Sequence, residues 1–272
     1  MLRKQIAGVL RRSPKMHEIA SRLYWSPFLS RLYYGLDRRF RTLSPGAPGA
    51  ISDALAKSRV DGDYYEFGLF RGYTFWHAQR AANRLGLMRT RFWGFDSFEG
   101  LPEPAGPDRD ASFFAGQFAC SRERVVRNLE KHGGVDWGRT ELIQGFFEDV
   151  LTDDLRARHA FGPVRVAFID CDLWRATCAV LDWLAPLIRP GTIILFDDWR
   201  GFGAREDVGQ PLAFGEFLAA NPDWQAAPFN EFADHGKGFV MDAARAWPAR
   251  SMPPQMGVAS LGERPTARSA SS

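Results

Sequence analysis

Acidic residues follow two apolar segments near the middle of the chain, and this spacing is typical of a site for a divalent cation. Residues 164–169 (VRVAFI) lead into Asp170, and residues 192–196 (TIILF) lead into Asp197 and Asp198. The residues between the two segments recur at helical spacing, which predicts a strand–helix–strand unit with parallel strands. Parallel strands lie about 4.8 Å apart and end at one edge of the sheet, so the three carboxylates are expected to meet. Their oxygen atoms favour Mg²⁺, Mn²⁺ or Ca²⁺ over zinc.

A turn that contains glycine, EFGLFRG, follows the first predicted strand and carries Glu66, Gly68 and Gly72. Glycines at this point let a ligand approach the backbone at a helix N-terminus. The dinucleotide fingerprint G-x-G-x-x-G is not present, because Phe70 occupies the place of its middle glycine. A carboxylate at Glu66 would repel a phosphate but would suit a cationic ligand. The alternative is a purely structural turn, since such glycines are frequent in α/β folds.

Asp96 ends the second predicted strand, where a carboxylate can accept hydrogen bonds from both hydroxyls of a ribose. It lies 28 residues after Gly68, farther than the usual spacing of about 20. The structural alternative for Asp96 is a cap on the turn at 96–98. For the acidic residues after the two middle strands, the alternative is a helix N-cap or a solvated loop residue. Glu66, Asp96, the turn after Gln144 and Asp170 all fall at carboxyl ends of strands. This shared placement predicts a nucleoside-like ligand without phosphate, next to a metal ion.

Several segments of the chain resemble the macrocin O-methyltransferase family, whose members use S-adenosylmethionine and Mg²⁺ to methylate hydroxyls of sugars on antibiotics and related natural products. From residue 61 to about residue 200 they read GDYYEFGLFRG, FWGFDSFEGLPEP, GFFEDVL, FIDCDLW and PGTIILFDDW. The resemblance implies Asp170, Asp197 and Asp198 as ligands of Mg²⁺ or Mn²⁺. It also implies a cofactor site. The methionine part of the cofactor would face Glu66, Gly68 and Gly72, the ribose would be held by Asp96 and Ser97, and the adenine would lie next to Gly145 and Phe146.

The mechanism implied by the resemblance is metal-assisted methyl transfer to a hydroxyl of a sugar or glycosylated natural product. A cation lowers the pKa of the acceptor hydroxyl, and Asp170, or as second choice Asp172, accepts its proton. The family has Tyr and then Glu-Ser where this chain has Trp174-Arg175-Ala176, so the acceptor pocket is expected to differ. The histidines are expected at the surface, although His235 lies in a loop close to the sheet end.

Two other functions are compatible with the sequence. One is a nicotinamide-dependent oxidoreductase on the same sheet, against which Phe70 argues. The other is a non-catalytic, membrane-associated or scaffolding protein that retains the fold and uses a basic N-terminal arm.

The charge is unevenly distributed along the chain. Residues 1–42 carry ten Lys or Arg and two Asp or Glu, whereas the remainder carries 25 basic and 30 acidic residues. We expect this amphipathic arm to pack on the domain or on a second subunit, or to contact anionic lipid at a membrane surface. Nucleic-acid binding is not expected, because no basic stripe with interleaved aromatics continues into the core.

The cysteines and the hydropathy favour a cytoplasmic protein. The three cysteines are odd in number and match no metal-binding spacing, which fits a reducing compartment. The sequence has no apolar run of about 18 residues, so no transmembrane segment is expected. Arg11 and Arg12 interrupt the only apolar stretch that could begin a signal sequence.

Strands and helices alternate along the chain, which predicts a doubly wound, mostly parallel α/β sheet with a terminal β-hairpin; the resemblance implies a class I methyltransferase-like Rossmann fold. We divide the chain into a helical arm and linker (1–50), the α/β domain (51–242) and a disordered tail rich in Pro and Ser (243–272). The loop at 102–118 is long for a compact domain, so it is expected to be mobile and functional.

Overall fold

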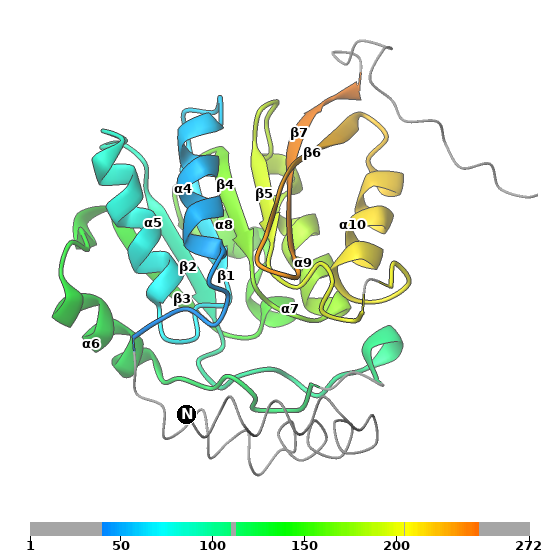
Figure 1. Cartoon of the computed structure of the whole chain (residues 1–272), viewed down its shortest axis with the longest axis horizontal. Coiled ribbons are helices and arrows are strands. Elements are labelled where there is room, and N and C mark those ends of the chain that lie inside the picture. Colours follow the sequence, from blue (N-terminus) through cyan, green and yellow to red (C-terminus); the bar gives the residue numbers. More distant parts are fainter. Residues whose placement is uncertain (1–39, 110–112, 204, 245–272) are drawn as a thin grey trace, which may run out of the picture.

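A seven-stranded sheet with helices on both faces forms the body of the molecule (Figure 1). The computed structural model describes residues 40–109, 113–203 and 205–244. The strand order is β3-β2-β1-β4-β5-β7-β6. The first five strands in this order are parallel to one another, and β7 runs antiparallel to both of its neighbours. The predicted doubly wound sheet with a terminal hairpin is therefore confirmed. The strands are β1 (Asp63–Phe67), β2 (Phe92–Asp96), β3 (Thr140–Gln144), β4 (Val164–Ile169), β5 (Ile193–Phe196), β6 (Trp224–Phe232) and β7 (Gly236–Ala243).

The helices divide between the two faces of the sheet. Helices α4, α5 and α6 pack on one face, and α8, α9 and α10 pack on the other. The α-helices are α4 (Ala47–Lys57), α5 (Tyr73–Arg84), α6 (Arg122–His132), α7 (Phe147–Val150), α8 (Asp153–Arg158), α9 (Trp174–Leu184) and α10 (Gly209–Ala220). Three 3-10 turns complete the described elements: η1 (Gly106–Asp108), η2 (Trp137–Arg139) and η3 (Ala185–Leu187).

The central strands are apolar because both faces of the sheet are covered. Every residue of β1, β4 and β5 is buried, as expected for parallel strands between two helical layers. Side chains alternate along β1, so Tyr64 enters the core under α4 and α5 while Tyr65 enters the core under α9. Burial of these aromatic and aliphatic side chains fixes the register of the strands, and with it the positions of the residues at the carboxyl edge.

The close packing of the first turn explains its leading glycine. A Cβ atom on Gly68 would lie 1.8 Å from the carbonyl oxygen of Asp170, and the φ angle of Gly68 is +92°. Gly72 also has a positive φ, of +82°, where it caps the N-terminus of α5. Both positions require glycine for the backbone itself, so the structural interpretation of this turn holds whether or not a ligand binds there.

Some predicted boundaries are displaced. The linker prediction is wrong for residues 47–50, which form the first turn of α4; Ala47 and Ala50 are buried against the sheet. The sequence analysis missed α7 and α8, which are four and six residues long. The sequence does contain a cue for α8, because Thr152 is a residue type that is favoured as an N-cap. In the structure its hydroxyl oxygen accepts a hydrogen bond from the Leu155 amide.

The ends of the chain fall outside the described residues. Predictions for the arm at residues 1–39 and for the tail at residues 245–272 therefore stay predictions, including a subunit contact or a membrane contact through the arm. Within the described residues, no helix is long and apolar enough to cross a membrane.

Candidate active site

A cavity of about 990 Å³ opens at the carboxyl edge of the sheet. Its walls come from the segment before α4, the turns after the parallel strands, the loop at 100–118 and the turn between β6 and β7. Of the residues predicted to form a site, Glu66 and Gly72 do not line this cavity. Those that do are Gly68, Asp96, Ser97, Gly145, Phe146, Asp170, Asp172, Asp197 and Asp198.

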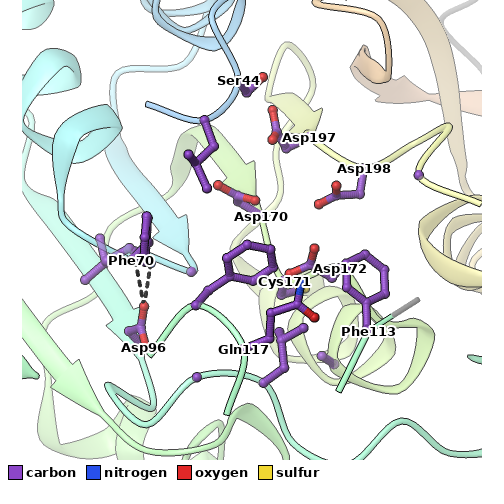
Figure 2. Close-up of a pocket in the computed structure, with 18 of the residues that line it drawn as sticks. Ser44, Phe70, Asp96, Phe113, Gln117, Asp170, Cys171, Asp172, Asp197 and Asp198 are labelled. Carbon is purple, nitrogen blue, oxygen red and sulfur yellow. Dashed lines mark hydrogen bonds between the residues drawn. The ribbon is translucent and has the colours of Figure 1, made fainter. Parts of the chain in front are cut away.

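Asp170 and Asp197 lie on neighbouring strand tips because the parallel ladder continues one residue past the strands. The Asp170 amide donates to the Phe67 carbonyl at 2.8 Å, and the Asp197 amide donates to the Ile169 carbonyl at 3.0 Å. Burial, and then the charges of Asp197 and Asp198, raise the pKa of Asp170 well above its usual range. Figure 2 shows the three carboxylates at the same end of the cavity. The predicted placement of these three residues at neighbouring strand ends is therefore confirmed, and their role as metal ligands stays a prediction.

The tightest group of candidate ligands in the described part of the chain also contains a histidine. The ligand atoms of Asp197, Asp198 and His235 all lie within 4.8 Å of one another, and Asp170 is not in this group. The Nε2 atom of His235 is 3.7 Å from Oδ2 of Asp197, and the His235 side chain is 34% exposed. The interaction with the neighbouring Asp197 carboxylate raises the pKa of His235. His235 is thus a partly exposed residue of the turn near the sheet end, as expected, and it also lines the cavity.

The hairpin could have revealed His235 from the sequence. Strand β7 runs antiparallel to β5, with Lys237 opposite Phe196. That pairing returns the turn between β6 and β7 to the tip of β5, next to Asp197. The sequence analysis predicted the hairpin but not the strand beside which it lies.

The acidic end of the cavity fits a divalent cation. Oδ1 of Asp197 and Oδ2 of Asp198 are buried and have no hydrogen-bond partner among the described residues, although buried polar atoms are usually paired. Burial and then the charge of Asp197 raise the pKa of Asp198 to about 7. A cation would satisfy both oxygens and offset the repulsion. Carboxylate oxygens with one imidazole suit Mg²⁺ and, because of the nitrogen, Mn²⁺ especially.

Asp172 lies in the same cluster, in an uncommon backbone conformation. Its φ angle is +62°, which non-glycine residues seldom adopt and which is most frequent for Asp and Asn. The residue is 6% exposed, and its carboxyl group lies near those of Asp197 and Asp198 (Figure 2). Burial and then the charges of Asp198 and Asp197 raise its pKa well above the usual range. Asp172 is thus a buried carboxyl group whose surroundings favour its protonated form.

Gln210, at the start of α10, links the two acidic strand tips. Its Oε1 accepts a hydrogen bond from the Asp198 amide at 2.9 Å, and its Nε2 donates to the Ile169 carbonyl at 3.0 Å. The side chain is fully buried. Sequence analysis missed this residue, because a lone glutamine at the start of a helix carries no motif.

Asp96 uses its carboxylate within the protein. Oδ2 accepts hydrogen bonds from the amides of Leu69 at 2.7 Å and Phe70 at 3.0 Å, and Oδ1 accepts one from the Phe98 amide at 2.6 Å. The turn-cap alternative for Asp96 is therefore observed. Asp96 nevertheless lines the cavity, and its next neighbour Ser97 accepts from the Glu99 amide and donates to the Gly100 carbonyl. Together these bonds fix the shape of the wall opposite the acidic cluster.

Glu66 lies behind the cavity wall. Its side chain is fully buried and accepts hydrogen bonds from Tyr64 Oη at 2.5 Å and Thr74 Oγ1 at 2.7 Å. Burial is the main cause that raises its pKa to about 8. Both oxygens are occupied by core hydroxyls, so the expectation that Glu66 faces the cofactor is not supported by this geometry.

The described parts of the loop at 102–118, residues 102–109 and 113–118, contribute to one wall of the cavity and are held by several hydrogen bonds. Asp108 is 1% exposed and accepts hydrogen bonds from the amides of Trp174 at 2.5 Å and Gly209 at 3.1 Å, the first residues of α9 and α10. At the base of the loop, the Leu101 amide donates to the Gln117 carbonyl at 2.9 Å. Sequence analysis predicted a functional loop here but did not identify these contacts.

Comparison with known proteins supports a methyltransferase. A sequence profile described as macrocin-O-methyltransferase (TylF) matches residues 45–210. The 8-demethyl-8-(2,3-dimethoxy-alpha-L-rhamnosyl)-tetracenomycin-C 4'-O-methyltransferase of Streptomyces olivaceus is 30% identical over 155 residues, which cover 55% of this chain and 57% of that relative. The mycinamicin III 3''-O-methyltransferase of Micromonospora griseorubida is 25% identical over 211 residues, which cover 75% of this chain and 78% of that relative.

Solved structures agree on the fold. The O-methyltransferase NovP superposes with a TM-score of 0.60 at 20% identity, over 71% of this chain and 78% of NovP. The calicheamicin methyltransferase CalS11 superposes with a TM-score of 0.54 at 18% identity, over 87% of this chain and 90% of CalS11. These likenesses show a class I methyltransferase-like fold. Because the family profile covers more than half of its residues, this chain belongs to the macrocin O-methyltransferase family.

Proposed function

We propose that this protein transfers a methyl group from S-adenosylmethionine to a hydroxyl of a sugar or glycosylated natural product, with the help of a divalent cation. The observation that carries the proposal is the pair of buried, unpartnered oxygens on Asp197 and Asp198 inside the cavity. A sugar acceptor is supported by the Streptomyces olivaceus relative, whose name specifies a dimethoxyrhamnosyl substrate.

The cofactor would lie along the β1–β2–β3 side of the cavity, against Gly68, Asp96, Ser97, Gly145 and Phe146. Bound S-adenosylmethionine supplies a methyl group on a positively charged sulfur. The buried acidic cluster favours that positive charge at the strand tips. Gly72 shapes the start of α5 and Glu66 supports the turn from behind, so neither is assigned a contact. Phe70 has a φ of +47° and fills the place of the middle glycine, which argues against a nicotinamide cofactor.

The cation would be held by Asp170, Asp197 and Asp198, with the imidazole of His235 next to them. A bound divalent cation lowers the pKa of a hydroxyl that it contacts. Gln210 fixes the Asp198 backbone and so helps to hold the carboxylate of Asp198 in place.

The proton of the acceptor hydroxyl would pass to a carboxylate of the cluster. A carboxylate that coordinates a cation is a weaker base, which favours Asp172 over Asp170 for this step. As the new bond between oxygen and methyl carbon forms, the bond between carbon and sulfur breaks and its electron pair stays on sulfur. Burial, the first cause of the raised pKa of Asp172, favours the protonated form and so supports this residue as the proton acceptor.

Calorimetry with S-adenosylmethionine, with and without Mg²⁺, tests the cofactor. Binding that Mg²⁺ leaves intact or strengthens is expected, and absence of binding under both conditions would contradict the proposal. Methyl transfer is then assayed with methyl α-L-rhamnopyranoside and larger rhamnosides by mass spectrometry. We expect a gain of one methyl group, loss of turnover with a chelator and recovery with Mg²⁺.

A further inference from the structure

The cavity wall contains a hydrogen-bond donor that the proposed mechanism does not use. Gln117 is 1% exposed and lines the cavity. Its Oε1 accepts a hydrogen bond from the Phe114 amide at 3.2 Å, whereas its Nε2 is buried without a partner. The bond to Phe114 also sets the orientation of the amide, because the reverse orientation would place two N–H groups against each other. The NH₂ group is therefore the end without a partner.

The backbone around Gln117 is fixed. The Leu101 amide donates to the Gln117 carbonyl at 2.9 Å, and the Gly116 amide donates to the Leu101 carbonyl at 2.8 Å. A Cβ atom on Gly100 would lie 2.3 Å from the Gln117 carbonyl oxygen, so the two ends of the loop are closely packed against each other. The donor is thus positioned before any ligand binds, which reduces the entropy lost on binding.

A second glutamine shows which part of this arrangement matters. Gln79 is also fully buried, its Oε1 also accepts from a backbone amide, that of Asp136 at 3.2 Å, and its Nε2 also lacks a partner. However, Gln79 does not line the cavity. An unpartnered amide can therefore be tolerated inside the protein, and Gln117 is distinguished because it borders a volume that a ligand can enter. Gln79 is consequently the matched control for Gln117.

The position of Gln117 favours the acceptor over the cofactor. Figure 2 shows Gln117 on the same side of the view as Asp172 and Phe113, and Asp96 on the opposite side. The acidic cluster is where the proposed reaction takes its proton, so the group that enters there is the acceptor. A neutral amide donor suits an uncharged oxygen, such as a hydroxyl, ring or glycosidic oxygen of a sugar.

We propose that Nε2 of Gln117 donates a hydrogen bond to an oxygen of the acceptor sugar and so helps to choose which hydroxyl is methylated; this inference rests on the proposed function. Gln117 is then an acceptor-binding residue on the loop at 102–118. On this loop, Nε2 of Gln117 has no partner within the protein and can bind the acceptor. On the cofactor side of the cavity, the carboxylate of Asp96 is already hydrogen-bonded to backbone amides.

The test measures two affinities in three proteins. Wild type, Gln117→Leu and Gln79→Leu are titrated with S-adenosylhomocysteine by calorimetry, and with methyl α-L-rhamnopyranoside by saturation-transfer NMR in the presence of S-adenosylhomocysteine and Mg²⁺. We expect Gln117→Leu to weaken glycoside binding about 3- to 10-fold, the loss of one neutral hydrogen bond, with unchanged affinity for S-adenosylhomocysteine. Gln79→Leu should change neither affinity and lower only the unfolding midpoint.

Several results would overturn the inference. These are unchanged glycoside affinity in Gln117→Leu, an equal loss of both affinities, or a wild type that binds S-adenosylhomocysteine but not the glycoside. A wild type that does not bind S-adenosylhomocysteine refutes the proposed function instead. If Gln117→Leu does not fold, a crystal structure of the wild type with both ligands decides: Nε2 should lie about 2.7–3.2 Å from a sugar oxygen. A sugar in the cavity away from Nε2 would contradict it.

Discussion

Carboxylates occur on both halves of the same sheet edge, but the two halves treat them differently. On the β1–β2 half, Asp96 accepts three backbone hydrogen bonds and Glu66 accepts two from side-chain hydroxyls. On the β4–β5 half, Asp197 and Asp198 each keep a buried oxygen without a partner. Acidic residues at strand ends can therefore build the fold or hold a ligand, and their hydrogen-bond partners decide which.

From this difference we expect loss of a carboxylate to have opposite effects on the two halves. On the β4–β5 half it should lower activity, and on the β1–β2 half it should lower stability. Asp198→Asn should lower kcat for methyl transfer by about 10³-fold, because the cation contributes several kcal/mol to the transition state. The variant should fold with unchanged or greater stability, since a repelled carboxylate is removed. Activity is measured by mass spectrometry and stability by urea unfolding. Activity within threefold of wild type, in the presence of a chelator, would refute the metal role.

Asp96→Ala should show the reverse signature. Three backbone amides lose their acceptor, so the free energy of unfolding should fall by about 2–3 kcal/mol. Urea unfolding of Asp96→Ala against Asp198→Asn checks this directly. If Asp96→Ala proved as stable as wild type and lost only affinity for S-adenosylmethionine, Asp96 would serve the ligand rather than the fold.

Gln210→Met tests how far the ligand-holding half depends on its support. Without the bonds to the Asp198 amide and the Ile169 carbonyl, the affinity for Mn²⁺ should fall about 10-fold, as is usual when support for a metal ligand is lost. The affinity for S-adenosylhomocysteine should not change. Equal losses of both affinities would indicate general unfolding of the edge.

The titration of Glu66 allows the β1–β2 half of the edge to be tested by pH. Its pKa is about 8 in the folded protein against an ordinary value of 4.5, chiefly because of burial. The folded state therefore binds the proton more tightly, so this contribution to stability is complete below pH 4.5 and is lost as pH rises through about 8. Glu66→Gln, which mimics the neutral acid, should exceed wild type in stability at pH 8 by at least about 1 kcal/mol. A parallel pH profile for both proteins would contradict this.

Much of the edge could be predicted from the sequence because it depends on local patterns. The apolar runs that precede Asp170 and Asp197 predict two parallel strands, and neighbouring parallel strands end at the same edge of a sheet. The meeting of the acidic tips follows from that rule alone.

The rest depends on contacts between distant segments. Gln117, Gln210 and His235 carry no motif. Gln117 and His235 reach the cavity through a loop and a turn, and Gln210 supports the acidic strand tips from the start of α10. Glu66 shows the opposite error. It has the right type and place for a ligand, but Tyr64 and Thr74 occupy its carboxylate. Which polar groups are already satisfied is a property of the packed structure.

Mn²⁺ titration followed by electron paramagnetic resonance tests the central claim most directly. In the presence of S-adenosylhomocysteine, wild type should bind one Mn²⁺, and the double variant Asp197→Asn/Asp198→Asn should bind it at least about 100-fold more weakly while still binding S-adenosylhomocysteine. Equal Mn²⁺ affinity in the two proteins would show that the unpartnered oxygens at the tip of β5 do not hold a cation, and the account of this half of the edge would be wrong.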